Sequence, residues 1–346
     1  MKIKIENKII SEKSPIYFIG EIGVNHNGSL SLAKKLISEA KKCGCSAVKF
    51  QIYKTENLVL KNTKLAKYQK KTGKKNMFDM LKKYELSFDK FKILKKFCDK
   101  KKITFLATPF DIESAEFLNK INISAFKISS GDLDNFILLR QIKKFKKPII
   151  LSTGMATEEE IRKTLKYLSY NKNKIAILHC ISEYPVALKN TQLGFIERLK
   201  KTGYLVGLSD HSKGETACYA SVAMGCVIIE KHITFNNKAT GPDHKASIQC
   251  NFLKSLIMNI NDLKKSISHK RRSLTKIEEQ NKKVSKKSLY FSRNINSGSI
   301  IKFDDIIALR PRLQRGISPS KYNLILKKKI KIKSIKFNPI LFSNLI

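Results

Sequence analysis

The sequence predicts an α/β protein made of a (β/α)8 TIM barrel followed by a small, β-rich C-terminal domain. From residue 16 to about residue 268, eight short apolar runs alternate with eight segments of helical periodicity. Each apolar run ends in polar or charged residues, which is typical of barrel strands whose carboxyl ends form a site. After residue 268 the chain becomes highly charged, and short apolar runs broken by turns follow.

The predicted strands are short runs rich in β-branched and other apolar residues, as expected for strands buried on both faces. Eight of them in about 250 residues match the size of this barrel. An open, doubly wound sheet is the alternative, but no GxGxxG pattern follows the first strand. The runs are 17–22, 47–51, 104–108, 125–129, 148–152, 175–180, 205–209 and 227–232.

Between these runs, apolar residues recur with the spacing of an amphipathic helix. One connection, 57–84 between the second and third strands, is too long for a simple loop and predicts an additional element. The predicted helices are 30–43, 88–100, 112–119, 135–145, 158–169, 193–200, 215–224 and 252–267.

The predicted domains are a barrel over 1–268, a linker over 269–287 and a small domain over 288–346. The linker prediction rests on a run of polar and charged residues. Within the small domain, Asn296-Ser297-Gly298 is a turn signal. About 60 residues bury too little surface to be very stable alone, so this domain would gain from docking on a partner.

The chain carries 69 basic and 28 acidic residues among 346, a formal net charge of +41. Sixty of the basic residues are lysines, nine are arginines, and the lysines are spread along the whole chain. A nucleic-acid-binding protein more often gathers arginine and aromatic residues on one face, so we expect no nucleic-acid partner. The positive field should instead attract a small anionic substrate.

The location of the protein is predicted from what the sequence lacks. Seven scattered cysteines without a CxxC motif indicate reduced thiols rather than a disulfide framework. The first 15 residues lack the apolar segment of a signal peptide, and no run approaches 18 apolar residues. We therefore expect a cytoplasmic protein that does not bind a membrane.

Polar residues at the strand ends predict an anion site. Lys49 and Lys127 lie within the apolar runs AVKFQ and AFKIS, where a merely solvated lysine is a poor explanation. Ammonium groups combined with hydroxyl donors suit a phosphate or a carboxylate. The hydroxyl donors at neighbouring strand ends are Thr108, Ser130, Ser152 and Ser209.

Two histidines predict a metal site. His211 and His232 end the seventh and eighth predicted strands, and Asp210 and Glu230 flank them. Imidazoles on adjacent strand ends can share one divalent ion and leave coordination positions open for substrate. The spacing of His26 leaves open whether it is a ligand or a hydrogen-bond donor in a loop.

With these strand ends in view, the chain resembles the sialic acid synthases, which condense phosphoenolpyruvate with amino sugars. This family has a TIM barrel followed by a small antifreeze-protein-like (SAF) domain. The matching runs occur in family order along the chain: GEIGVNHNGSLSLAK, AVKFQ, ATPFD, AFKISSGDLDN, ILSTGMAT, LHCISEYP, GLSDHS, EKHIT, GPDHKAS and GISP.

The resemblance implies a role for each matching residue. A divalent ion, manganese with magnesium or cobalt as alternatives, is held by His211 and His232. Glu21 and Asp132 are the candidates for moving protons. The sugar is faced by Glu21, Gln51, Tyr184 and Asp243, and phosphoenolpyruvate is held by Lys49, Thr108, Lys127, Ser130, Ser152, Ser182 and Ser209.

The sequence departs from the family pattern at three positions. Asp132 stands where the family often has glutamate, and Ser182 stands where some members have asparagine. The C-terminal arginine motif is degraded to RPRLQRGISP, so the sugar-contacting arginine is Arg312, or Arg310 by another alignment. The resemblance also implies a domain-swapped homodimer, in which this arginine reaches the partner's barrel.

Two alternatives concern the function itself. The sugar could be N-acetylmannosamine, giving N-acetylneuraminate, or 2,4-diacetamido-2,4,6-trideoxymannose, giving N,N'-diacetyllegionaminate. From another class, the chain could be a non-catalytic barrel that binds a polysaccharide or a nucleic acid. That alternative predicts loss of the strand-end residues, which are nearly all present.

Overall fold

The computed structural model describes residues 1–66, 69–169, 172–267 and 271–346. It divides into two compact units, Met1–His269 and Lys270–Ile346. Across the described ranges, no helix combines the length and apolar character that crossing a membrane requires.

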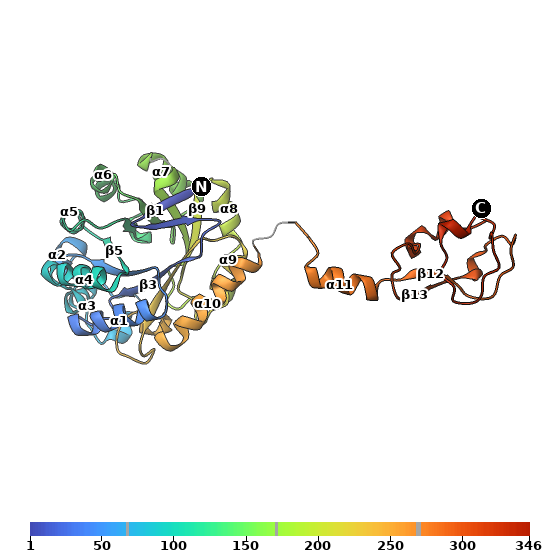
Figure 1. Ribbon diagram of the computed structural model, residues 1–346. Coiled ribbons are helices and arrows are strands. Elements are labelled where there is room, and N and C mark those ends of the chain that lie inside the picture. The colour runs from blue at the N-terminus through green and yellow to red at the C-terminus, as the bar shows by residue number, and fades with distance from the viewer. Residues whose placement is uncertain (67–68, 170–171, 268–270) are drawn as a thin grey trace. The chain divides into compact units, whose positions relative to one another are not determined.

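The first unit is a closed barrel of eight parallel strands, which Figure 1 shows inside a ring of helices. Closure is explicit, because β10 pairs with both β9 and β3. The predicted barrel is therefore confirmed, and the open sheet is excluded. The strands are β3 (Tyr17–Gly23), β4 (Ala47–Ile52), β5 (Thr104–Pro109), β6 (Phe126–Ile128), β7 (Ile149–Ser152), β8 (Ile175–Cys180), β9 (Leu205–Asp210) and β10 (Ile228–Thr234).

A helix follows each strand and buries one apolar face against the barrel. Side chains that accept hydrogen bonds from free N–H groups fix several of the starts, among them Ser29, Ser87, Asp111 and Thr157. The helices are α1 (Leu30–Lys42), α4 (Phe88–Lys101), α5 (Ile112–Lys120), α6 (Phe136–Lys144), α7 (Glu158–Leu168), α8 (Phe195–Lys201), α9 (Thr216–Ala223) and α10 (Cys250–Ser266), the last preceded by the short strand β11 (Ile248–Gln249).

The long connection after β4 folds over the carboxyl ends of the strands. It contains α2 (Thr55–Leu58), a 3-10 turn (Gln69–Thr72) and α3 (Met77–Tyr84). Met80 and Tyr84 of α3 are buried against Val24, which follows β3. The additional element expected here is therefore a cover on the end of the barrel where the polar strand ends lie.

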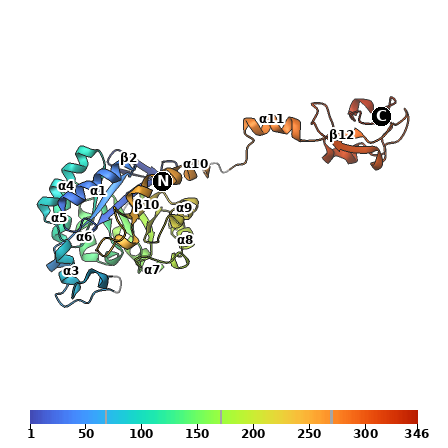
Figure 2. The same cartoon turned by 90° about the horizontal axis from the view of Figure 1, so that it is seen from below.

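An N-terminal hairpin that the sequence did not predict closes the other end of the barrel. Strands β1 (Lys2–Ile5) and β2 (Lys8–Ser11) pair antiparallel and bury Ile3, Ile5 and Ile10 against the amino-terminal ends of the barrel strands. In Figure 2 the hairpin and α3 lie at opposite ends of the barrel. Only the carboxyl end is thus left for a site.

The second unit has its own small core, formed by residues such as Phe291, Ile301 and Ile330. Its regular strands, β12 (Ser288–Phe291) and β13 (Ile306–Leu309), form an antiparallel pair, and turns and short 3-10 segments make up much of the rest. Regular strands therefore make up a smaller part of this unit than the prediction of a β-rich domain implied.

The segment interpreted above as a linker is not irregular throughout. Residues Lys276–Ser285 form helix α11. Thr275 and Glu278 form a capping box that satisfies the first N–H groups of this helix. None of its residues is buried, so the helix rests on local interactions.

The hairpin should contribute measurably to the stability of the barrel. Replacing Ile5, which is fully buried, by alanine should lower the free energy of unfolding by about 2–5 kcal/mol because it leaves a cavity. Ile9→Ala on the neighbouring strand is the control, since Ile9 is 54% exposed and should change stability by no more than about 0.5 kcal/mol. Urea unfolding of both variants measures the difference, and equal effects would show that the hairpin does not seal the barrel.

Candidate active site

A cavity of about 760 Å³ lies at the carboxyl ends of the barrel strands, and every strand contributes a side chain to its lining. This is the end at which (β/α)8 barrels carry their active sites. The predicted site residues that line it are Glu21, Lys49, Gln51, Thr108, Lys127, Ser130, Ser152, Ser182, Tyr184, Ser209, His211 and His232.

Lys49 lies in a network of buried charges. Its ammonium nitrogen is 3.0 Å from Glu21 Oε2 and 3.8 Å from Glu230 Oε1, and it donates to the Thr108 hydroxyl at 3.2 Å. Burial alone would lower the pKa of Lys49, but the two carboxylates outweigh burial and raise it. Lys49 is therefore held charged inside the cavity.

Lys127 faces the same carboxylate from the other side. Its ammonium lies 3.6 Å from Glu230 Oε1 and donates to Ser152 Oγ at 2.6 Å. Burial lowers the pKa of Lys127, and Glu230 opposes that shift. Glu230 in turn accepts from Ser209 at 3.0 Å, and the two lysines lower its pKa although burial alone would raise it. One carboxylate thus holds both lysines in place.

Hydroxyl groups gather around the backbone of Gly154, directly after β7. The Gly154 N–H donates to Ser130 Oγ at 2.9 Å. A Cβ atom at this position would lie 2.5 Å from Ser182 Oγ and 2.8 Å from Ser130 Oγ. Only glycine leaves the two hydroxyls this close to the chain, and two hydroxyl donors beside a backbone N–H are suited to cradle a tetrahedral anion.

His211 and His232 lie together in the same cavity, with their ring centres 5.5 Å apart. His211 Nδ1 is 2.8 Å from the Ile181 carbonyl oxygen, which can only accept, so Nδ1 carries the proton and Nε2 offers a lone pair. Burial holds the pKa of His232 well below its usual range, and His232 is therefore neutral.

The histidine pair fits a divalent metal ion. His232 Nδ1 is buried and has no hydrogen-bond partner among the described residues, and Asp243 Oδ2 lies 3.7 Å from it. Two imidazoles near a carboxylate suit such an ion. No group of three or more His, Cys, Asp or Glu side chains arranged for a metal occurs in the described ranges.

Two carboxyl groups next to the histidines have raised pKa values. Burial raises the pKa of Glu21 to about 7, against the attraction of Lys49. Burial likewise raises the pKa of Asp243 to about 6. A carboxyl group that titrates near neutral pH is suited to give or take a proton.

Three predicted residues are not part of the cavity lining. Asp243 lies next to it, beside His232. Asp132 accepts hydrogen bonds from Ser129 at 2.6 Å and from Asn135 at 3.0 Å, at the turn before α6. Arg312 belongs to the second unit, where it donates to the Lys287 carbonyl oxygen at 2.9 Å.

Glu230 and Cys180 are among the cavity residues that had no role in the sequence-based prediction. Glu230 was noted only as a neighbour of the histidines, although it alternates with His232 on β10 and so faces the same side. Cys180 ends β8 and lies 3.8 Å from His211 Nδ1. The alternation along β10 was the available signal for Glu230, whereas a buried cysteine at a strand end is not distinctive.

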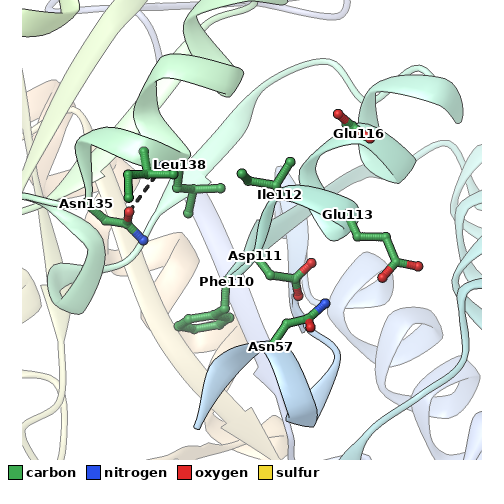
Figure 3. A pocket seen from close by; sticks show the side chains of 9 residues that line it. Asn57, Phe110, Asp111, Ile112, Glu113, Glu116, Asn135 and Leu138 are labelled. Carbon is green, nitrogen blue, oxygen red and sulfur yellow. Dashed lines mark hydrogen bonds between the residues drawn. The ribbon is translucent and has the colours of Figure 1, made fainter.

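A second cavity, of about 500 Å³, lies outside the barrel mouth, and its lining is shown in Figure 3. It carries three carboxylates, Asp111, Glu113 and Glu116, beside apolar residues such as Ile112. This lining disfavours an anion, whereas the central cavity carries two buried lysines.

The NeuB family model matches residues 36–272, about two thirds of the chain. The chain belongs to the NeuB family. The resemblance to the sialic acid synthases is therefore confirmed.

Relatives in this family carry names of synthases for different nine-carbon sugar acids. An N,N'-diacetyllegionaminic acid synthase of Campylobacter jejuni is 40% identical over 316 residues, covering 90% of this chain and 94% of the relative. An N-acetylneuraminate-9-phosphate synthase of Drosophila melanogaster is 35% identical over 269 residues, covering 75% and 72%. The crystal structure of a sialic acid synthetase from Leptospira borgpetersenii has a TM-score of 0.74 at 32% identity, covering 81% of this chain and 95% of that one.

The hydroxyl cradle of this NeuB-family chain can be tested by substitution. Gly154→Ala should weaken binding of phosphoenolpyruvate by about tenfold or more, because the methyl group displaces two hydroxyl donors worth about 1.5–3 kcal/mol each to a charged ligand. Isothermal titration measures the dissociation constant. Gly194→Ala is the control, since a Cβ atom there meets nothing within 4 Å. Unchanged binding in Gly154→Ala would remove the cradle from the anion site.

Proposed function

We propose that this chain is a nonulosonic acid synthase that condenses phosphoenolpyruvate with an N-acetylated mannosamine-type sugar. The enol carbon attacks the aldehyde carbon of the open-chain sugar, water adds at C2 of the former phosphoenolpyruvate, and phosphate leaves. The observation that carries the proposal is that one cavity is lined both by two buried lysines with several hydroxyl groups and by two histidines with carboxyl groups nearby.

Phosphoenolpyruvate would contact the lysines and hydroxyl groups of the cavity lining. Lys127 would hold its phosphate together with Ser152 and the cradle of Ser130 and Ser182. Lys49, with Thr108 and Ser209 nearby, would hold its carboxylate. Because Lys49 and Lys127 both contact Glu230, their ammonium groups are fixed before substrate arrives, and less ordering is required on binding.

A divalent metal ion, manganese by family resemblance, would be held by His211 and His232. When bound, it polarises the aldehyde oxygen as a Lewis acid. The protein's own part is orientation: the hydrogen bond from His211 Nδ1 to Ile181 fixes which ring nitrogen faces the ion.

Glu21 is the proton carrier that the geometry favours. Its pKa near 7 keeps both protonation states accessible at neutral pH, and its carboxyl group lies between Lys49 and the histidines. The second candidate from the sequence, Asp132, is engaged by Ser129 and Asn135. We therefore assign proton transfer to Glu21 and a structural role at the start of α6 to Asp132.

The sugar would contact the part of the lining near the two histidines. Tyr184 stacks against His211 with ring centres 4.0 Å apart, and Gln51 lines the same cavity. Asp243 lies beside His232. N-Acetylmannosamine is one candidate sugar. The other candidate sugar is 2,4-diacetamido-2,4,6-trideoxymannose. The sequence identity of this chain to two N,N'-diacetyllegionaminic acid synthases supports it.

The decisive experiment is phosphate release from phosphoenolpyruvate by the purified full chain. The proposal expects release only when an N-acylated hexosamine is added, and loss of activity after chelation with recovery on adding manganese, magnesium or cobalt. A panel with both candidate sugars and mass determination of the product identifies the substrate. Release that is independent of sugar, or full activity without metal, would contradict the corresponding part of the proposal.

We also propose that the second unit is an antifreeze-like domain that completes the site of a partner subunit in a domain-swapped homodimer. Lys270–Ile346 forms a separate compact unit and carries Arg312, whereas the other predicted sugar residues belong to the barrel unit. The family resemblance supports contact of this arginine with the sugar bound in the partner's barrel.

Subunit mixing tests this arrangement. Arg312→Ala and His232→Ala homodimers should each be inactive, but a mixture should recover activity, because one of the two sites in a heterodimer then contains both intact parts. Native mass spectrometry must first show that subunits exchange. Exchange without recovery would show that the arginine acts within its own chain or has no role in turnover.

A further inference from the structure

A buried ion pair lies behind the two histidines, outside the central cavity. Lys231 stands between Glu230 and His232 on β10, and strand alternation directs its side chain to the opposite face. It is 1% exposed and pairs with the Asp210 carboxylate, which lies directly opposite on β9. Neither residue is part of the cavity lining.

The same lysine reaches past the end of the strand ladder to the turn that carries His211. The pairing between β9 and β10 ends at Asp210. Beyond it, the Lys231 ammonium donates to the Ser212 carbonyl oxygen at 2.8 Å, and Asp210 Oδ1 accepts from the Ser212 N–H at 2.8 Å. Both residues flanking His211 are therefore held by one ion pair.

The other contacts of His211 lead to a different part of the barrel. Its ring donates to the Ile181 carbonyl oxygen, and its own carbonyl oxygen accepts from the Val186 N–H at 3.1 Å. Both partners belong to the connection after β8. Beyond the end of the ladder, the hydrogen bond from Lys231 to Ser212 thus links this turn to the strand of His232, in addition to the contact between the two imidazole rings.

Stability alone gives little reason for this ion pair. Desolvation of two charges offsets most of their attraction, so apolar replacements of a buried pair are often neutral or stabilising. A charged pair that also grips a backbone carbonyl oxygen has a geometric consequence that an apolar pair lacks. Lys231 differs from an apolar replacement in its hydrogen bond to the Ser212 carbonyl oxygen.

We infer that Lys231 is a positioning residue for the divalent metal site, setting the distance between His211 and His232 from outside the cavity. The inference rests on the metal assigned in the proposed function. Removing Lys231 would free the His211 turn from β10, and the two imidazoles would no longer be fixed relative to each other.

Manganese binding to the full chain, followed by the electron paramagnetic resonance signal of free Mn²⁺, tests the inference without using activity. Lys231→Met leaves Asp210 buried and unpaired and could fail to fold, so the Asp210→Asn/Lys231→Met double variant is the main test. It removes both charges, and the amide oxygen of the introduced asparagine can still accept from the Ser212 N–H. We expect Mn²⁺ affinity about tenfold or more weaker, the range seen when residues that support metal ligands are replaced.

Two reference variants separate the outcomes. Cys218→Ala removes the other side chain near Asp210 Oδ2, at 3.2 Å, without touching the turn, and should bind Mn²⁺ as the unaltered chain does. His211→Ala should abolish specific binding.

If the double variant unfolds cooperatively and binds Mn²⁺ like the unaltered chain, the inference is overturned and the proposed function stands. If the unaltered chain itself binds no Mn²⁺, both the inference and the metal assignment are overturned, whereas sugar-dependent phosphate release still decides the reaction independently.

Discussion

The rest of this structure depends on pairing each buried charge of the cavity with a charge of opposite sign. Lys49 and Lys127 are buried at the carboxyl end of the barrel, and Glu21 and Glu230 lie against them. Breaking such a pair by removing one partner typically costs about 3–5 kcal/mol, so the four side chains are fixed as a group. The pKa of Glu21 near 7 adds a consequence for binding. When Glu21 takes up a proton, the group becomes net positive, and an anion entering the cavity meets lysines with fewer competing carboxylates.

The closed barrel makes this arrangement possible. Parallel strands bring their carboxyl ends to one rim, so eight segments from across about 250 residues each place a side chain in the same cavity. The hairpin Lys2–Ser11 fills the opposite end, and α3 covers part of the rim. Access is thereby restricted to the carboxyl end of the barrel, where the polar strand ends meet.

Most of the lysines that give the chain its large positive charge do not belong to the candidate site. Among the described residues, only three of the lysines are buried: Lys49, Lys127 and Lys231. Two face the cavity, and the third braces the His211 turn from behind. Each is paired with a carboxylate. The remaining lysines give the molecule a diffuse positive field, which attracts anions without selecting among them.

The sequence by itself determined the barrel, because apolar runs and helical patterns are local and alternate eight times from Tyr17 to Ser266. It also marked the lysines and histidines, since polar residues at the ends of apolar runs must meet at one rim once the strands are parallel. The short N-terminal hairpin was missed, because two four-residue strands, KIKI and KIIS, carry little signal until they have a barrel end to cover. Only the tertiary structure decided that Glu230 joins both lysines, that Asp132 turns toward Ser129 and Asn135, and that Lys231 holds Ser212. These pairings join residues on different strands or depend on which way a loop side chain turns, and such distances and directions exist only after the strands have found their register.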